Sequence, residues 1–139
     1  ELLCVPVLLG EKVPEEVESL GEPLLCPMLD ARRMEVYAGI WNRALKPVRE
    51  IGADIVDGET YKELLDSHPV YFFGNGAAKC IEVINHPNAH LIEGINPIAK
   101  NMMPLAERRL NNGMTEDVAY FVPSYLKDYV AKLPKNLLK

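Results

Sequence analysis

The stretch from Leu24 to Asn42, LLCPMLDARRMEVYAGIWN, most constrains how this chain can fold. It contains two apolar runs, residues 24–29 and 34–41, and the polar-leaning residues 30–33 separate them. Two strand-like runs joined by a short linker that contains Asp are typical of an antiparallel β-hairpin. The sequence therefore predicts a hairpin over these residues.

The second run of the hairpin is apolar on both faces. Val36 and Ile40 fall on one face, and Tyr37 and Trp41 fall on the other, because side chains alternate along a strand. An aromatic face is unusual for plain solvent surface, so we expect this strand to lie inside a sheet that is covered on both sides over part of its length. The first run contains Pro27, which cannot donate to a ladder and predicts an edge strand or a bulge.

Downstream of the hairpin, the pattern alternates between strands and helices. A third strand is expected within residues 44–55, and Thr60 and Glu63 have the spacing of a capping box for a short helix that ends near Ser67. Pro97 at the first helical position and Gly113 past the last one predict a longer helix capped by Asn96. The remaining expected elements are strands at 70–73, 89–92 and 118–122, and helices at 13–17, 77–84 and 125–133.

A hairpin extended by a third strand and followed by alternating helices and strands predicts the α/β class, with a mixed sheet and helices. At 139 residues the chain is long enough for one domain with a real core.

The start of the chain enters an apolar pattern at once, without an N-cap residue. This favours an element that is already under way at Glu1, so the chain is interpreted as a fragment. The first ten residues fit a strand or the tail of a helix, and Pro6 disfavours a helix through it. In such a fragment, the apolar side chains of this opening are expected to be exposed: Leu2, Leu3, Val5, Val7 and Leu8.

The composition is that of an ordinary globular protein, with 48% hydrophobic and 25% charged residues. The net charge of −5 argues against a general nucleic-acid binder, and no apolar run approaches the ~20 residues of a membrane span. Cys4, Cys26 and Cys80 are widely spaced in apolar surroundings, so we expect buried thiols and a cytoplasmic location.

Gly74-Asn75-Gly76 is the strongest candidate for a ligand site. It lies at an expected strand-to-helix junction, where backbone N–H groups can hold an anion. The alternative is that the glycines only permit a tight turn, and a lone G-x-G favours this alternative.

The other polar groups give weaker signals. Asp30 with Arg32 and Arg33 fits a polar site at the hairpin turn, but a turn-forming Asp with two exposed cations is the simpler interpretation. His86 and His90 are four residues apart, yet the Pro between them and the missing Glu remove the H-E-x-x-H pattern. We therefore expect no metal site and no catalytic residues. The lysines near the end form a basic tail suited to contact with nucleic-acid phosphates, although a solvated face is the default.

Three motifs, in order, resemble the TsaB (YeaZ-like) family of bacterial tRNA threonylcarbamoyladenosine biosynthesis proteins. They are Asp30-Ala31-Arg32 with Glu35-Val36-Tyr37, Phe72-Phe73-Gly74-Asn75-Gly76-Ala77, and Pro123-Ser124-Tyr125-Leu126-Lys127. They cover only the C-terminal half of the family. Lys127 departs from the family pattern, in which Arg is usual, and a Lys loses bidentate pairing.

This resemblance implies one lobe of an actin-like, ribonuclease-H-like fold. It implies a lead-in over residues 1–23 from a missing N-terminal lobe, the lobe itself over 24–127, and a basic tail over 128–139. The implied function is a non-catalytic scaffold that supports a TsaD-like paralogue and a TsaE-like ATPase in tRNA modification, with a homodimer as a further option. ATP or ADP would bind only with the missing lobe or a partner. The alternatives are a glycoprotease-like hydrolase and a sugar-kinase-like nucleotide-binding lobe.

Overall fold

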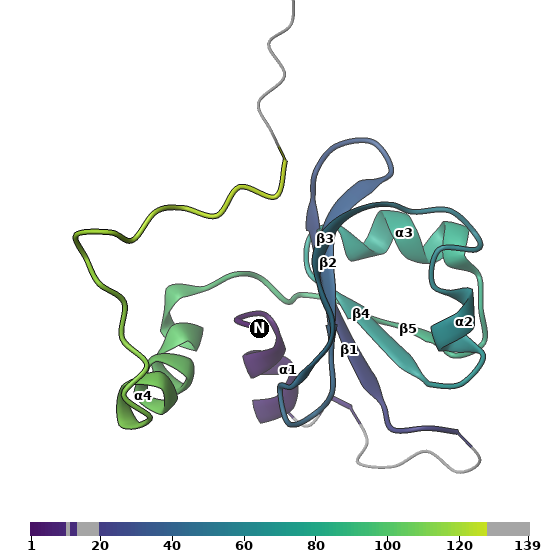
Figure 1. Cartoon of the computed structure of the whole chain (residues 1–139). Coiled ribbons are helices and arrows are strands. Elements are labelled where there is room, and N and C mark those ends of the chain that lie inside the picture. The colour runs from purple at the N-terminus through teal and green to yellow at the C-terminus, as the bar shows by residue number, and fades with distance from the viewer. Residues whose placement is uncertain (11, 14–19, 128–139) are drawn as a thin grey trace, which may run out of the picture.

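The fold is built on a five-stranded mixed sheet with the strand order β3-β2-β1-β4-β5. The computed structural model describes residues 1–10, 12–13 and 20–127. Helices α2 and α3 cover one face of the sheet, and α1 lies on the other face, with α4 beyond it (Figure 1). The elements are α1 Cys4–Leu9, β1 Leu24–Asp30, β2 Glu35–Trp41, β3 Pro47–Ile55, α2 Lys62–Leu65, β4 Val70–Phe73, α3 Ala77–Ile84, β5 Ala89–Ile92, the 3-10 helix η1 Ala99–Met102 and α4 Met103–Asn111.

The predicted hairpin is confirmed, as are the α/β class and the mixed sheet. β1 and β2 are antiparallel, with Asp30 opposite Val36 and Leu25 opposite Trp41, and β3 continues the antiparallel pairing. β1 also pairs with β4 in parallel, and β4 pairs with β5 in parallel. The strands expected at 70–73 and 89–92 and the helix at 77–84 have the predicted bounds.

The prediction for Pro27 was wrong in part. Pro27 lies in the central strand of the sheet, opposite Phe73 of β4, rather than at an edge. On the β2 side it falls between the paired positions Leu25–Trp41 and Met28–Ala38. The β1–β2 register is the same on either side of Pro27, and the register shifts of β2 lie in its pairing with β3, so the sheet holds this proline without a bulge between β1 and β2.

The larger core lies between the sheet and helices α2 and α3. Alternate residues of the three central strands point to this face and are buried, and Leu65 and Cys80 pack onto them from the helices. The strand residues in this core are Leu24, Cys26, Met28, Val36, Ala38, Ile40, Val70 and Phe72.

The smaller core lies on the opposite face and contains the start of the chain. Leu25, Trp41 and Phe73 of the sheet pack there against Cys4 and Val7 of α1. Both faces of β2 are therefore covered over part of its length, as the alternation predicted.

The opening residues form a helix that runs through Pro6, so the expectation for this proline was wrong. Pro6 is the third residue of α1, where the backbone N–H of any residue would lack an intrahelical acceptor. The expected exposed apolar opening was also wrong: Leu3, Val5 and Val7 are at most 5% exposed, and Leu3 and Val7 pack against the chain's own sheet.

The three cysteines are free and buried, as expected. Burial raises the pKa of the Cys4 thiol to about 12 and raises the pKa of the fully buried Cys26 thiol further. Both thiols are therefore held in the protonated, unreactive form at neutral pH.

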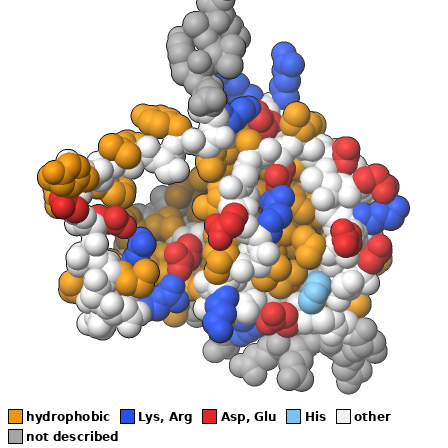
Figure 2. Space-filling view, viewed as in Figure 1, with side chains coloured by type: hydrophobic (Ala, Val, Ile, Leu, Met, Phe, Trp, Pro, Cys, Tyr) orange, Lys and Arg blue, Asp and Glu red, His pale blue; other side chains and the backbone are white. Residues whose placement is uncertain are grey.

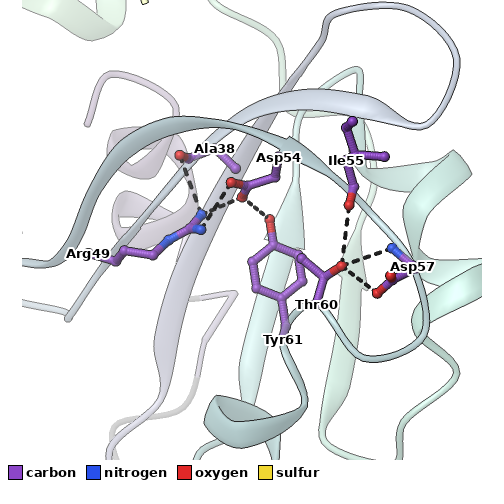
Figure 3. Close-up of polar contacts among 7 residues, drawn as sticks. All are labelled: Ala38, Arg49, Asp54, Ile55, Asp57, Thr60 and Tyr61. Atoms are coloured by element: carbon purple, nitrogen blue, oxygen red, sulfur yellow. Dashed lines mark hydrogen bonds and ion pairs between the residues drawn. The ribbon is translucent and has the colours of Figure 1, made fainter.

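Thr60 does not cap α2, so the predicted capping box was wrong. Its hydroxyl instead donates to Asp57 Oδ1 at 2.7 Å and accepts from the Asp57 backbone N–H at 2.9 Å. Thr60 thus closes a small turn before the helix (Figure 3). Helix α2 begins one residue later than predicted, after Tyr61, and Leu65 is its buried residue.

A half-buried polar network fixes β3 onto the core (Figure 3). Arg49 and Asp54 form an ion pair of 2.5 Å, and the Tyr61 hydroxyl donates to the same carboxylate at 2.5 Å. Desolvation of its ring and hydroxyl raises the pKa of Tyr61. The network ties the outermost strand to the loop that precedes α2.

The segment after β5 departs most from prediction. Asn96 does not cap a helix; η1 begins at Ala99 and α4 at Met103, with Pro104 in its first turn. Helix α4 buries none of its residues, and Leu110 is 67% exposed. The strand predicted at 118–122 is absent, and hydrophobic side chains of this segment are exposed to solvent (Figure 2).

Among the described residues, the structure contains no helix that is long and apolar enough to span a membrane. Most of the helices predicted at 13–17 and 125–133, and the basic tail at 128–139, lie outside the described residues.

Candidate functional site

The candidate site lies where the chain leaves β1 and β4 in opposite directions. These two strands are parallel neighbours, so their carboxyl ends lie at the same edge of the sheet. From β1 the chain turns back into β2 on one side, and from β4 it passes through α3 to β5 on the other side (Figure 1). In open α/β sheets, ligands bind outside the carboxyl ends of strands at such a switch point.

The Gly74–Gly76 turn packs directly against the end of β1. The side-chain oxygen of Asn75 accepts from the Asp30 N–H at 3.0 Å, and the Gly76 N–H donates to the Met28 carbonyl at 3.1 Å. Gly74 has a φ of +100°, and a Cβ there would lie 2.4 Å from the same carbonyl oxygen. The turn is thus joined to β1 through its own polar groups, and an anion site at these three residues stays a prediction.

Lys79 of α3 forms hydrogen bonds to the end of β1 and to the hairpin loop. Its ammonium donates to Asp30 Oδ1 at 2.5 Å and to the carbonyls of Arg33 at 2.5 Å and Glu35 at 2.9 Å. The hydrogen bond from Lys79, together with that from the Arg32 N–H, lowers the pKa of the Asp30 carboxyl. Three contacts match the three N–H donors of an ammonium, so Lys79 has no donor left for a ligand.

The hairpin loop places two consecutive arginines in the left-handed backbone region. The φ angle is +85° for Arg32 and +49° for Arg33. This conformation costs an L-residue roughly 1–2 kcal/mol, and Gly, Asn and Asp are the residues that usually adopt it. The Asp30 carboxylate accepts from the Arg32 N–H at 3.0 Å and so supports the first of the two.

An open hollow of about 790 Å³ lies beside this loop. Lys127, near the end of the described chain, reaches the loop and forms an ion pair with Glu35. In Figure 1 the yellow end of the chain approaches the β1–β2 loop. The hollow is lined by Ala31, Arg32, Arg33, Met34, Glu35, Ile55 and Lys127.

The charge of the hollow is positive, because three cationic side chains line it against one carboxylate. Glu35 is engaged by Lys127, which raises the pKa of that lysine. Within the part of the chain that the structure describes, neither the Arg32 nor the Arg33 guanidinium has a side-chain or backbone acceptor. The arrangement can hold an anion, for which two guanidinium groups are suited.

The histidines lie apart from this hollow. His86 is 3.4 Å from the Asp66 carboxylate, and His90 stacks on Tyr71 with ring centroids 4.8 Å apart. Among the described residues, the structure has no group of three or more His, Cys, Asp or Glu side chains that could hold a metal ion.

Sequence reasoning found the two loops but not how they join. It identified the Gly74–Gly76 turn and the Asp30–Arg33 linker as separate features. The parallel pairing of β1 with β4, which no local motif signals, brings them together. Lys79 was missed entirely, because a single lysine in a short amphipathic helix carries no distinguishing pattern.

The comparisons with known proteins identify a likeness of fold. The structure is similar to the crystal structure of an uncharacterized protein with similarity to peptidase YeaZ from Pseudomonas aeruginosa, with a TM-score of 0.64 and 17% sequence identity. The match covers 91% of this chain and 55% of that protein, so the chain spans about half of its length. No family model and no curated protein sequence matches the chain.

Proposed function

We propose that this chain corresponds to the C-terminal half of a TsaB-like protein and acts as a non-catalytic scaffold in tRNA threonylcarbamoyladenosine modification. Its partners would be a TsaD-like paralogue and a TsaE-like ATPase. The observation that carries the proposal is the YeaZ-like fold, which extends over 91% of the chain. Two of the motifs add support because Asp30-Ala31-Arg32 and Gly74-Asn75-Gly76 meet at the switch point of this fold.

Genetic depletion tests this role. Cells that lack the gene for this chain should lose threonylcarbamoyladenosine, which mass spectrometry of hydrolysed tRNA measures. Re-expression of the gene should restore the modified nucleoside. An unchanged level after deletion would overturn the proposal.

Co-purification with the TsaD-like paralogue from the same genome tests the partner. We expect the full-length gene product to bind it and this chain alone to bind it much more weakly, with the missing lobe providing most of the interface. Equal binding by the two proteins would place the interface in this half and contradict that part of the proposal.

A second candidate function is hydrolysis, which the description of the Pseudomonas protein as similar to a peptidase favours. A labelled casein assay, with and without added divalent metal, distinguishes it from the scaffold role. We expect no turnover above a heat-denatured control. Turnover that follows the intact protein through gel filtration would favour the hydrolase instead.

A further inference from the structure

We propose that the hollow beside the β1–β2 loop binds phosphate groups of a nucleotide or of an RNA chain, with Arg32 and Arg33 as the contacting residues. This inference goes beyond the scaffold role and does not depend on it. It stands on the loop conformation, on the charge of the hollow and on the shape and chemistry of its lining.

The backbone of the loop is strained at both arginines. Both lie in the left-handed region, where a residue other than Gly or Asn is uncommon. Strained residues persist where the surrounding structure determines them, and they cluster at ligand-binding sites. Here Lys79 and Asp30 hold the loop, through the Arg33 carbonyl and the Arg32 N–H respectively.

In the described part of the chain, some charged side chains at the loop are paired with each other, and two arginines are not. Lys79 and Asp30 neutralise each other, as do Lys127 and Glu35. The guanidinium groups of Arg32 and Arg33 are the cations that remain among the described residues of this loop. Guanidinium groups bind phosphate bidentately and are less strongly hydrated than an ammonium group. An adjacent pair of them therefore suits a phosphate ligand.

The lining of the hollow favours a nucleotide over an inorganic ion. Its volume of about 790 Å³ is far larger than one phosphate requires. Met34 and Ile55 also line it, and Ile55 is 74% exposed. These side chains provide apolar surface on which a base or ribose could rest while the arginines hold the phosphate.

Fluorescence anisotropy with a fluorescein-labelled, mixed-sequence 12-nucleotide single-stranded RNA tests the proposal, with unlabelled ATP and inorganic tripolyphosphate as competitors. The variant Arg32→Gln/Arg33→Gln removes both guanidinium groups. We expect it to weaken RNA binding about tenfold or more. The dependence of binding on salt should also become shallower, by about 0.7 for each phosphate contact that is lost.

The control variant Lys46→Gln/Lys100→Gln changes the net charge by the same amount at exposed positions, one of them at the other end of β2. It should stay within about twofold of the wild type. The variant Arg32→Lys/Arg33→Lys keeps the charges and should retain the salt dependence while losing part of the affinity. Circular dichroism melting of each variant shows that the fold is intact.

The competitors distinguish the two sources of phosphate. Displacement of the RNA by ATP supports a nucleotide site, and failure of both ATP and tripolyphosphate to displace it supports recognition of an RNA backbone. Absence of RNA and ATP binding to the wild-type chain at 50 mM salt would overturn the proposal. An equal loss in the two glutamine variants, or none in either, would also overturn it. Co-purification with a TsaD-like protein is a separate readout, so failure of one proposal leaves the other standing.

Discussion

The Lys79 ammonium lies 2.5 Å from Oδ1 of Asp30, although 49 residues separate the two in the chain. The contact joins α3 to the end of β1, and two further hydrogen bonds from Lys79 reach carbonyls of the hairpin loop. One side chain therefore ties the helix that follows the Gly74–Gly76 turn to the hairpin loop.

Replacement of Lys79 by Met should destabilise the fold, because the variant keeps the apolar stem and removes three hydrogen bonds. Hydrogen bonds from charged groups contribute about 1.5–3 kcal/mol each when buried, and partial exposure of Lys79 reduces this, so we expect a total loss of about 1–3 kcal/mol. Urea unfolding measures it. Lys62→Met is the matched control, since Lys62 forms an exposed ion pair with Glu59, and its loss should cost much less than the loss of Lys79. Equal costs for the two variants would contradict the role of Lys79.

The contribution of Asp30 should depend on pH. Its pKa in the folded protein is lowered, first by the hydrogen bond from Lys79 and then by that from the Arg32 N–H. A lowered folded-state pKa gives stability that is present above the unfolded-chain value of 3.8 and is lost as the pH falls through the folded-state value. The stability difference between the wild type and Asp30→Asn should thus be constant from neutrality to about pH 5 and shrink below about pH 4. A difference that does not change over this acid range would contradict the assignment.

The Gly74–Gly76 turn should not tolerate a side chain at its first position. Gly74→Ala combines a positive φ with a Cβ placed 2.4 Å from the Met28 carbonyl oxygen. We expect a loss of about 2–4 kcal/mol in the free energy of unfolding. Gly94→Ala provides the control, because Gly94 also has a positive φ of +75° but no atom within 4 Å of the added Cβ. It should cost only roughly 1 kcal/mol of backbone strain. Similar costs for both would mean that the turn can move away from β1.

Elements that carry their own local signal were predictable from the sequence. The hairpin, the buried run of β4 and the helix that begins at Ala77 each have a periodicity or a turn that specifies them. Pro6 and Thr60 were misread because a local rule has more than one outcome. A proline fits the first turn of a helix as well as a break, and a threonine can close the turn before a helix instead of capping it.

The rest depends on contacts that a local pattern does not contain. The sequence predicts a longer helix capped by Asn96, yet α4 has no buried residue, and Leu105 is the one of its side chains that is half-buried. The candidate site could not be predicted from a local pattern either, because the β1–β4 pairing that creates it joins residues about 45 positions apart.

The proline in the central strand also affects the chain before it folds. Residues 24–29 are a continuous apolar run of the kind that can stack into cross-β assemblies when it is exposed. Pro27 has no backbone N–H in either the folded or the unfolded chain. A second copy of this run that paired with it as a strand would therefore lack one hydrogen-bond donor in the ladder. Within the native sheet the same gap lies between the Leu25–Trp41 and Met28–Ala38 pairs. The unpaired position that the native sheet accommodates at Pro27 thus also interrupts the ladder that this apolar run would form with a second copy before the chain folds.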